Sequence, residues 1–421
     1  MITTLGIKNF KSLRDVRLEL GKLNFFIGTN ASGKSNVFDA IRVLQGIGNG
    51  FTFGEILDGK PKSATSEVWE PIRGGSAKAA FIKEDPSSSF QLEATVEERN
   101  ADTGKLWKAE YGVGFNTGNQ RVIEEWLTVG RPVYDSRPLA GPIHHTLPQT
   151  DPRFHAAPTF DVKYFHGKKG AWPNIPSEHH RAVLTQMARR TSDRWAKNHV
   201  IAASRLSGIF ANTQRLDPSP PLLREYSRAQ NVSRMGERGE NFAALIRTIC
   251  EDPGTKDAYL TWLKHLRPAE VDDIGILKGA VGELMFKLEE NRREFPAPVL
   301  SDGTLRFAAI TAAFFQPDMP SLLTLEEIEN GIHANRLRLL VELLRNRTQT
   351  GQPQVVVTTH SPIVLAWLQP GEYAHTFFCK RDEQTGESRI LPLTEIPHFN
   401  DTVKRQPIGD LFTEGWLEAA L

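Results

Sequence analysis

The sequence is poor in cysteine and lacks long apolar runs. These two shortages argue against a disulfide-rich protein and against a membrane-spanning protein. Its 421 residues include two cysteines, Cys250 and Cys379, which match no zinc or redox spacing. A disulfide framework is therefore excluded, and a reducing compartment is expected. No run of about 18 apolar residues predicts a transmembrane helix. Met1 leads directly into a strand-like pattern without an apolar signal segment. We therefore expect a cytoplasmic protein without a membrane partner.

Heptad repeats, D-x-D pairs and metal-binding clusters are also missing. Without sustained heptads, no long coiled-coil arm is predicted. Only 61 residues follow His360, and they contain no D-x-D pair that could hold the metal ions of a nuclease domain. His144-His145 and His179-His180 have no cysteine or acid at ligand spacing, so both pairs are interpreted as surface-loop residues. We therefore expect that the chain does not cut nucleic acid by itself.

Length and charge leave two questions open. A chain of 421 residues predicts two lobes, or one domain with a large insertion. The net charge is only +1, but residues 167–247 contain 14 Lys and Arg against 6 Asp and Glu. That excess fits either a solvated helical surface or a surface that binds nucleic acid or an acidic partner. One possible cluster on a helix face is Arg189, Arg190 and Arg194.

The pattern of apolar residues divides the chain into three parts. Residues 1–129 contain a strand–turn–helix unit and then period-2 runs at 79–82, 90–96, 107–115 and 122–128, which predict an antiparallel β lobe. Residues 130–240 are expected to form an insertion, irregular over 131–176 and then helical. Residues 241–421 return to alternating helices and strands, and end in a hairpin at 382–386 and a helix at 408–421.

Residues 28–35 read G-T-N-A-S-G-K-S and match the phosphate-loop pattern G-x-x-x-x-G-K-[ST] without deviation. An apolar strand pattern precedes them and a helical pattern follows, which favours a nucleotide site over a structural glycine turn. In such a loop, backbone N–H groups converge on the β-phosphate, Lys34 adds positive charge at the β- and γ-phosphates, and Ser35 ligates Mg²⁺. The residues expected to contact ATP here are Asn30, Ala31, Ser32, Gly33, Lys34, Ser35 and Asn36.

Two glutamates follow an apolar strand pattern at residues 321–325. In a phosphate-loop fold, a strand beside the loop supplies an acid to the Mg²⁺ shell, and a neighbouring acid can polarise the attacking water. Glu326 is expected in the first role and Glu327 in the second. By itself, a pair of glutamates is more often an ordinary exposed strand end.

A histidine and a small polar loop add two further signals. Residues 354–358 form a strand pattern that leads to His360, whose ring could reach a γ-phosphate, although a lone histidine is more often structural. Residues 300–304 read L-S-D-G-T and open a helix, and a helix N-terminus can bind an anion. We call these residues the signature loop, with Ser301 and Gly303 as the candidate contacts.

Taken together, these motifs resemble an ATPase family. The order of phosphate loop, insertion, L-S-x-G-x loop, acidic strand and T-x-H strand is similar to that of ABC-type ATPase heads. It is most similar to the RecF/SMC/OLD-like group, AAA-type ATPases of phage defence and DNA repair. Residues 7–13 resemble the first strand of that group, residues 326–333 its E-E-P-E-N-G-L-H block, and residues 358–362 its T-T-H-S-P. The resemblance covers residues 1–129 and 240–395, and lacks the TOPRIM nuclease domain of the OLD family.

The resemblance implies an α/β fold, in which an ABC-type head combines a core sheet and an antiparallel β lobe with a largely helical insertion. It implies ATP and Mg²⁺ as cofactors, with Ser35 and Glu326 at the metal and with Lys34, Glu327 and His360 as catalytic residues. Three residues depart from the general pattern, namely Ala31 and Asp302 in place of glycines and Glu326 in place of aspartate. None of the three indicates a dead site.

Heads of this kind place the signature loop of one subunit over the nucleotide of another, so the resemblance implies a head-to-head dimer or a higher oligomer. The leading hypothesis is an ATP-hydrolysing switch subunit that acts with a separately encoded effector, such as a nuclease, in phage defence or DNA repair. The alternative is a stand-alone, RecF-like ATPase that binds DNA directly. A transport subunit is a third possibility, but no Q-loop glutamine is recognisable.

Overall fold

The computed structural model describes residues 1–60, 69–81, 88–99, 104–129, 131–135, 159–164, 174–189, 197–266, 271–349 and 353–420. The chain forms two compact units, each made of segments that are distant in the sequence. Unit 1 comprises residues 1–21, 31–213 and 379–390, and unit 2 comprises residues 22–30, 214–378 and 391–421. The division along the chain at residues 130 and 241 stays a prediction. None of the described helices has the length and apolar character needed to cross a bilayer.

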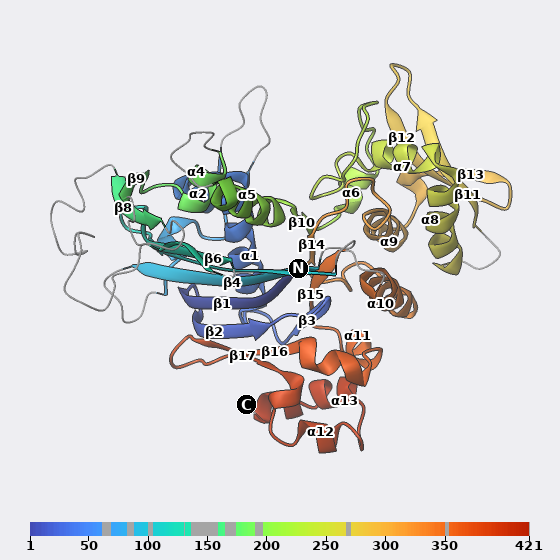
Figure 1. Ribbon diagram of the computed structural model, residues 1–421. Coiled ribbons are helices and arrows are strands. Elements are labelled where there is room, and N and C mark those ends of the chain that lie inside the picture. The colour runs from blue at the N-terminus through green and yellow to red at the C-terminus, as the bar shows by residue number, and fades with distance from the viewer. Residues whose placement is uncertain are drawn as a thin grey trace. The chain divides into compact units, whose positions relative to one another are not determined.

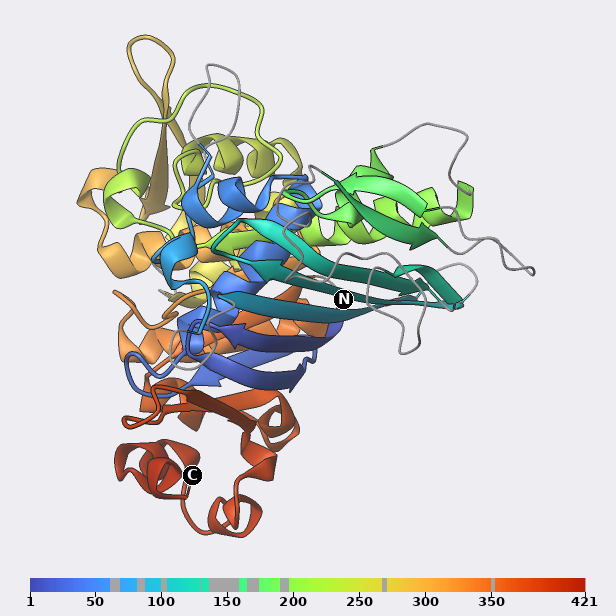
Figure 2. The same ribbon diagram turned by 90° about the vertical axis from the view of Figure 1, so that its left-hand side faces the viewer.

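An eight-stranded sheet forms the centre of unit 1, and all its neighbouring strands pair antiparallel. In its long strand β4, buried and half-exposed residues alternate, which is the pattern of a sheet with one covered face. Figure 2 shows these strands, coloured from blue to green, lying side by side. Their order across the sheet is β2 (Leu13–Glu19), β1 (Ile2–Phe10), β4 (Ser89–Arg99), β5 (Leu106–Asn116), β6 (Arg121–Val129), β7 (Arg131–Asp135), β8 (Thr159–Tyr164) and β9 (Asn174–Glu178).

Helices cover one face of this sheet (Figure 1). They are α1 (Lys34–Asn49), α2 (Phe53–Asp58), α4 (Val183–Ala188) and α5 (Lys197–Ala211), and a 3₁₀ turn spans Ser76–Lys78. Helix α1 ends at Gly50, whose φ of 74° provides the left-handed C-cap that glycine adopts without strain. Glu125 of β6 is fully buried and accepts hydrogen bonds from Tyr111 and from the backbone N–H groups of Val183 and Leu184. This carboxylate therefore fastens the start of α4 to the sheet.

Unit 1 differs from the sequence prediction in three places. The stretch 131–176 was expected to be irregular, but its described residues, 131–135, 159–164 and 174–176, belong to strands β7, β8 and β9 of the large sheet. The predicted strand at 79–82 is reduced to one bridge, between Ala80 and Phe10, and residue 82 lies outside the described residues. His179 is buried beside the Val122 carbonyl, so its placement in a surface loop was wrong, whereas His180 is exposed. His144, His145 and the rest of residues 136–158 lie outside the described residues.

Three parallel strands form the centre of unit 2. They are β14 (Leu322–Leu325), β15 (Gln354–Thr359) and β3 (Leu23–Ile27), and β15 lies between the other two. Every residue in these strands is buried, as expected for parallel strands with both faces covered. The sheet is completed by β10 (Thr213–Leu216) beside β14 and by β16 (Thr376–Arg381) and β17 (Ser388–Pro392) beyond β3.

A second, three-stranded sheet and the remaining helices complete unit 2. The sheet is antiparallel and consists of β11 (Val271–Lys278), β12 (Leu284–Glu290) and β13 (Arg293–Pro296), with α7 (Phe242–Glu251) and α8 (Pro253–Leu266) beside it (Figure 1). The other helices are α6 (Pro220–Leu223), α9 (Asp302–Ala312), α10 (Ala334–Gln349), α11 (Pro362–Ala366) and α12 (Phe399–Thr402). The single C-terminal helix predicted at 408–421 is two short helices, α13 (Ile408–Thr413) and α14 (Trp416–Ala419), because Gly415 has a φ of 73°.

Candidate functional site

The carboxyl ends of β3, β14 and β15 meet at one edge of the parallel sheet of unit 2. The start of the phosphate loop follows β3, Glu326 and Glu327 follow β14, and His360 follows β15. The register pairs Thr359 with Ile27, so the last residues of β15 and β3 are neighbours. Ligands of open α/β sheets bind at this edge. The fold therefore brings together the three strand ends that carry the predicted motifs.

The phosphate loop curls through three left-handed residues. Gly28, Ala31 and Gly33 have φ values of 144°, 62° and 104°. At Ala31, where related loops have glycine, a non-glycine residue holds a conformation that costs about 1–2 kcal/mol. At Gly33 no other residue fits, since an added Cβ would lie 2.3 Å from Oγ of Ser388. The loop is thus fixed by backbone geometry as well as by its sequence.

Helix α1 begins at Lys34 without a side-chain cap and without an acidic residue in its first turn. The N–H of Asn36 donates to the Gly33 carbonyl, and the dipole of the helix favours an anion at this end. The Ser32 hydroxyl is buried and makes no hydrogen bond to any described residue. Lys34 is also buried, and its charge lowers the pKa of the neighbouring Cys379 thiol, which burial raises to about 12. Uncapped amides, an unpaired hydroxyl and a buried cation together suit a phosphate group.

A chain of hydrogen bonds braces the loop within unit 1. Asn36 Nδ2 donates to Ser12 Oγ over 2.7 Å, and Ser12 Oγ lies 2.6 Å from Oγ of Ser388. The backbone N–H of Ser388 also donates to the Ser12 carbonyl. Neither serine was predicted as a site residue. Ser12 occurs in the motif at residues 7–13, but that pattern identified a strand rather than a hydrogen-bonding partner.

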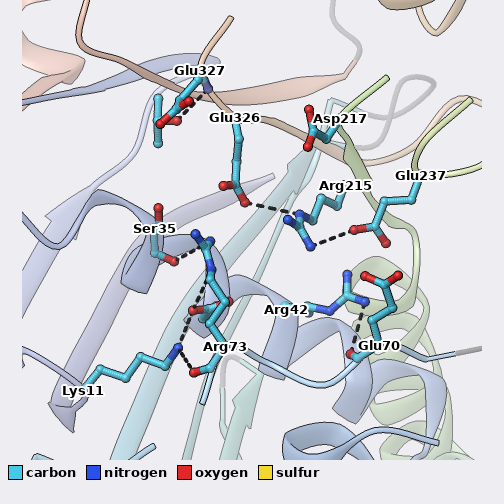
Figure 3. Close-up of polar contacts among 12 residues, drawn as sticks. Lys11, Ser35, Arg42, Glu70, Arg73, Arg215, Asp217, Glu237, Glu326 and Glu327 are labelled. Atoms are coloured by element: carbon cyan, nitrogen blue, oxygen red, sulfur yellow. Dashed lines mark hydrogen bonds and ion pairs between the residues drawn. The ribbon is translucent and has the colours of Figure 1, made fainter. Parts of the chain in front are cut away.

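A basic cavity of about 370 Å³ lies in unit 1 beside the first turn of α1. Asn36 and Phe81 line it, together with the cations Lys11, Arg73, Lys78 and Arg381. Lys11 binds Asp39 and the Arg73 carbonyl, and burial lowers the pKa of the Lys11 ammonium while Asp39 raises it. Arg73 reaches the Ser35 carbonyl over 3.5 Å (Figure 3). The cavity offers several positive charges to an anionic ligand.

Arg215 of β10 holds the Glu326 carboxylate (Figure 3). Its Nε lies 3.2 Å from Oε1 of Glu326, and its Nη1 lies 2.8 Å from Oε1 of Glu237. The Glu326 carbonyl accepts a hydrogen bond from Arg306, which also pairs with Asp217. Arg215 was not predicted as a site residue, because it lies between the two stretches that the family resemblance covers and carries no motif.

Glu327 occupies a strained backbone position after β14, with a φ of 45°. Its N–H donates to Thr358 Oγ1 over 2.9 Å, and its Oε2 accepts from Asn330 Nδ2 over 2.6 Å. Strain of this kind clusters at functional sites. His360 lies at the end of the neighbouring β15, and its Nδ1 is 2.9 Å from Oε1 of Glu329.

Ser301 caps α9, because its Oγ accepts a hydrogen bond from the Thr304 N–H. Thr304 Oγ1 in turn accepts from Arg336 over 3.1 Å. At Gly303 an added Cβ would lie 2.4 Å from the Gly331 carbonyl oxygen, so only glycine lets α9 approach the loop that carries Glu327. The signature loop therefore packs against the acidic loop within unit 2.

The predicted magnesium ligands suit that ion by their chemistry. Ser35 and Glu326 offer hydroxyl and carboxylate oxygens, the hard donors that Mg²⁺ prefers, and Mg²⁺ is commonly held by few protein groups together with phosphates and water. In the described part of the chain, no cluster of three or more His, Cys, Asp or Glu could hold a metal ion by protein ligands alone. The donor set therefore fits Mg²⁺ that arrives with a nucleotide.

Many basic side chains of residues 167–247 are already paired. Six arginines of this stretch form ion pairs with nearby carboxylates. The pairs are Arg181–Glu178, Arg205–Glu98, Arg215–Glu237, Arg224–Asp302, Arg234–Asp318 and Arg247–Glu251. Arg189 donates to the Asn49 carbonyl, while Arg190 and Arg194 lie outside the described residues. These contacts occupy part of the positive charge of the described residues, and binding of nucleic acid by this stretch stays a prediction.

Two known proteins are similar in sequence to this chain. A Helicobacter pylori protein named ATP/GTP phosphatase is 23% identical over 401 residues, which make up 91% of this chain and 94% of that protein. Arcadin-4 from Pyrobaculum calidifontis is 31% identical over 138 residues, 32% of this chain and 16% of that protein.

A solved structure and a family model agree with this similarity. The crystal structure of an SMC head bound to the C-winged helix domain of ScpA is 14% identical, with a TM-score of 0.51, and the match covers 93% of this chain and 96% of that one. It shows that the chain has an SMC-head-like α/β fold, which confirms the predicted fold class. A family model described as "AAA domain, putative AbiEii toxin, Type IV TA system" matches residues 23–366. Since that match spans most of the chain, the chain belongs to this AAA family and is a P-loop ATPase with an SMC-head-like fold.

Proposed function

We propose that the chain is an ATP-driven switch subunit that acts with a separately encoded effector, such as a nuclease, in phage defence or DNA repair. One observation carries the ATPase part, namely the meeting of the start of the phosphate loop, Glu326–Glu327 and His360 at one edge of the parallel sheet. The family description names an AbiEii toxin of a Type IV TA system. A toxin–antitoxin pair consists of two proteins, so the description supports a separately encoded partner but does not say that the partner is a nuclease.

In the proposed site, the N–H groups of the phosphate loop bind the β-phosphate, and Lys34 neutralises the β- and γ-phosphates. Asn30, Ala31, Ser32, Gly33 and Asn36 form the rest of this cradle. Bound Mg²⁺ would supply charge neutralisation at the phosphates, and Ser35 and Glu326 would hold it, Glu326 through a water. Arg215 keeps the Glu326 carboxylate in a defined position through their ion pair. The basic cavity beside Asn36 accommodates the sugar and α-phosphate end, since pockets for small ligands start at about 300 Å³.

Glu327 takes the proton of the attacking water in this scheme. Its contacts to Thr358 and Asn330 fix both its backbone and its carboxylate, which a general base requires. His360 contacts the γ-phosphate from the end of the neighbouring strand. Both groups come from loops that follow rigid, fully buried strands, so their positions are defined before the nucleotide binds.

Ser301 and Gly303 act on the nucleotide of a second subunit in this proposal. The Ser301 hydroxyl bonds only within the first turn of α9, among the residues that the structure describes. ATP binding then closes two heads over two shared nucleotides, and hydrolysis lets them separate, a shift of population driven by the ligand. The effector binds to, or is activated by, one of these two states.

A mixture of two inactive variants tests the shared site. Ser301→Arg spoils the signature loop, and Lys34→Ala spoils the phosphate loop. In a mixed dimer, one site combines both intact loops and the other combines both spoiled ones. A mixture of equal amounts should recover about a quarter of the wild-type ATPase rate, since half of the dimers are mixed and each has one working site. If mixed dimers are confirmed by differential tagging and no ratio restores activity, the in-trans role of Ser301 is wrong.

A reconstitution experiment tests the effector. The purified chain is incubated with DNA or RNA, Mg²⁺ or Mn²⁺ and ATP, alone and with the product of each adjacent gene. We expect that the chain alone cleaves neither DNA nor RNA. We expect cleavage that depends on ATP once the partner is added. The Glu327→Gln variant with the partner is the control for nucleotide dependence. Cleavage by the chain without a partner that persists in Glu327→Gln would contradict the proposal. Stimulation of the ATPase by DNA without any partner protein would also contradict it, and would favour the stand-alone, DNA-binding alternative.

A further inference from the structure

Glu329 contacts His360 at two points through a single oxygen. Its Oε1 accepts a hydrogen bond from the backbone N–H of His360 over 2.7 Å and lies 2.9 Å from the ring Nδ1. The Glu329 side chain is only 10% exposed, while that of His360 is 43% exposed. The other oxygen of Glu329 is buried and has no hydrogen-bond partner among the described residues. Among the described residues, the side-chain oxygens of Glu329 therefore have polar contacts to His360 alone.

The contact bears on which ring nitrogen carries a proton. An ionised carboxylate only accepts hydrogen bonds, so a hydrogen bond across this 2.9 Å contact requires Nδ1 of His360 to donate. When one ring nitrogen donates in this way, the other is left for a ligand. Among the described residues, no hydrogen bond involves Nε2 of His360. Since the same oxygen also binds the backbone N–H, the position of the ring and the end of β15 are held together.

The loop that carries Glu329 is attached to β15 at two further points. The N–H of Glu327 donates to Thr358 Oγ1 over 2.9 Å, and the N–H of Ile328 donates to the Thr358 carbonyl over 3.3 Å. Glu327, Glu329 and His360 are thus held in one frame at the sheet edge. A displacement of the Glu329 carboxylate would free the ring without moving β15, because β15 is also paired with β14 and β3.

We propose that Glu329 is a positioning residue for His360, which orients the ring and keeps the proton on Nδ1 so that Nε2 meets the γ-phosphate. The proposal rests on the proposed function, in which His360 contacts that phosphate. A merely structural glutamate would tie two loops together and leave the chemistry of the ring unchanged. The two roles therefore differ in the spectroscopy of the ring and in how substitutions at the two positions combine.

The kinetic test compares Glu329→Gln with Glu342→Gln. Glutamine keeps the length of the side chain but loses the charge, and its amide can present a donor to the ring. Glu342 is a matched control, since its carboxylate binds Arg338 on the same helix, α10. For Glu329→Gln we expect kcat to fall about tenfold or more while KM for ATP stays within about twofold, as for the loss of a group that orients a catalytic side chain. The control should keep the wild-type values. A kcat within twofold of wild type for Glu329→Gln would overturn the inference.

The double variant Glu329→Gln/His360→Ala shows whether the two residues act as one. If Glu329 works through His360, the double variant should be no slower than His360→Ala alone. If the losses multiply, Glu329 acts independently of the ring and the inference is wrong. A wild-type kcat for His360→Ala would contradict the proposed contact of His360 with the γ-phosphate, and with it the role of Glu329.

Nitrogen-15 NMR of the nucleotide-free protein separates these failures. His360→Ala identifies the ring signals of His360 among those of the 12 histidines. In the wild-type protein, the Nδ1 shift should be that of a protonated nitrogen. In Glu329→Gln, the signals should move toward a mixture of tautomers, whereas Glu342→Gln should leave them in place. Ring signals that are identical in wild type and Glu329→Gln would overturn the positioning role even if the ATPase proposal holds.

Discussion

Lys34→Ala is expected to weaken ATP binding about a hundredfold or more and to abolish hydrolysis. The Lys34 ammonium is the one cation within the phosphate loop, and it lies in a buried position where water screens its charge poorly. Loss of one such charge beside two phosphates costs on the order of 3 kcal/mol, which is about two powers of ten in Kd. Isothermal titration calorimetry with a non-hydrolysable ATP analogue measures the affinity, and phosphate release measures turnover.

Lys22→Ala is the matched control for this variant. Lys22 is exposed and comes directly before β3, so its side chain stands at the opposite end of that strand from the phosphate loop. Its backbone carbonyl accepts from the Val355 N–H, and this bond survives the substitution. We expect the control to bind and hydrolyse ATP as the wild type does. ATP binding at wild-type strength by Lys34→Ala, in a protein with an unchanged melting temperature, would contradict the assignment of the phosphate loop.

The centre of the site could be predicted from sequence because each of its motifs is local. The phosphate loop, the glutamates after β14 and the histidine after β15 each follow a short apolar strand, and parallel strands bring their carboxyl ends to one edge of a sheet. The strands predicted at residues 321–325 and 354–358 were therefore placed to within one residue at each end. Knowing the strands was enough to place the side chains that follow them.

The supporting contacts could not be predicted, because they join residues that are distant in the sequence. Ser12 and Ser388 are in contact although 376 positions separate them in the sequence. Arg215 contacts Glu326 from a strand in a region without a motif. No local pattern reports such pairs. The irregular composition of residues 131–176 likewise concealed β7 and β8, whose pairing depends on the preceding strands of the sheet rather than on their own periodicity.

Glu327→Gln is expected to lower kcat about a hundredfold or more while ATP binding is retained. An amide cannot take the proton of the attacking water, and the loss of a general base costs about two to four powers of ten. The substitution should leave the site otherwise intact, because the Glu327 N–H that binds Thr358 belongs to the backbone and a glutamine oxygen can still accept from Asn330. The strained φ of 45° suits glutamine no less than glutamate.

The retained ATP should also trap the closed dimer. With hydrolysis blocked, the heads stay joined for as long as ATP is present, so size-exclusion chromatography with light scattering should show a larger species for Glu327→Gln with ATP than for the wild type. Adding Lys34→Ala to the same chain should remove that species, since the double variant no longer binds the nucleotide. Glu414→Gln, an exposed glutamate near the C-terminus, should behave as wild type in both measurements. Wild-type turnover in Glu327→Gln would leave the catalytic base unassigned. Slow turnover without the larger species would instead separate catalysis from dimer closure, and would limit the proposal to ATP hydrolysis alone.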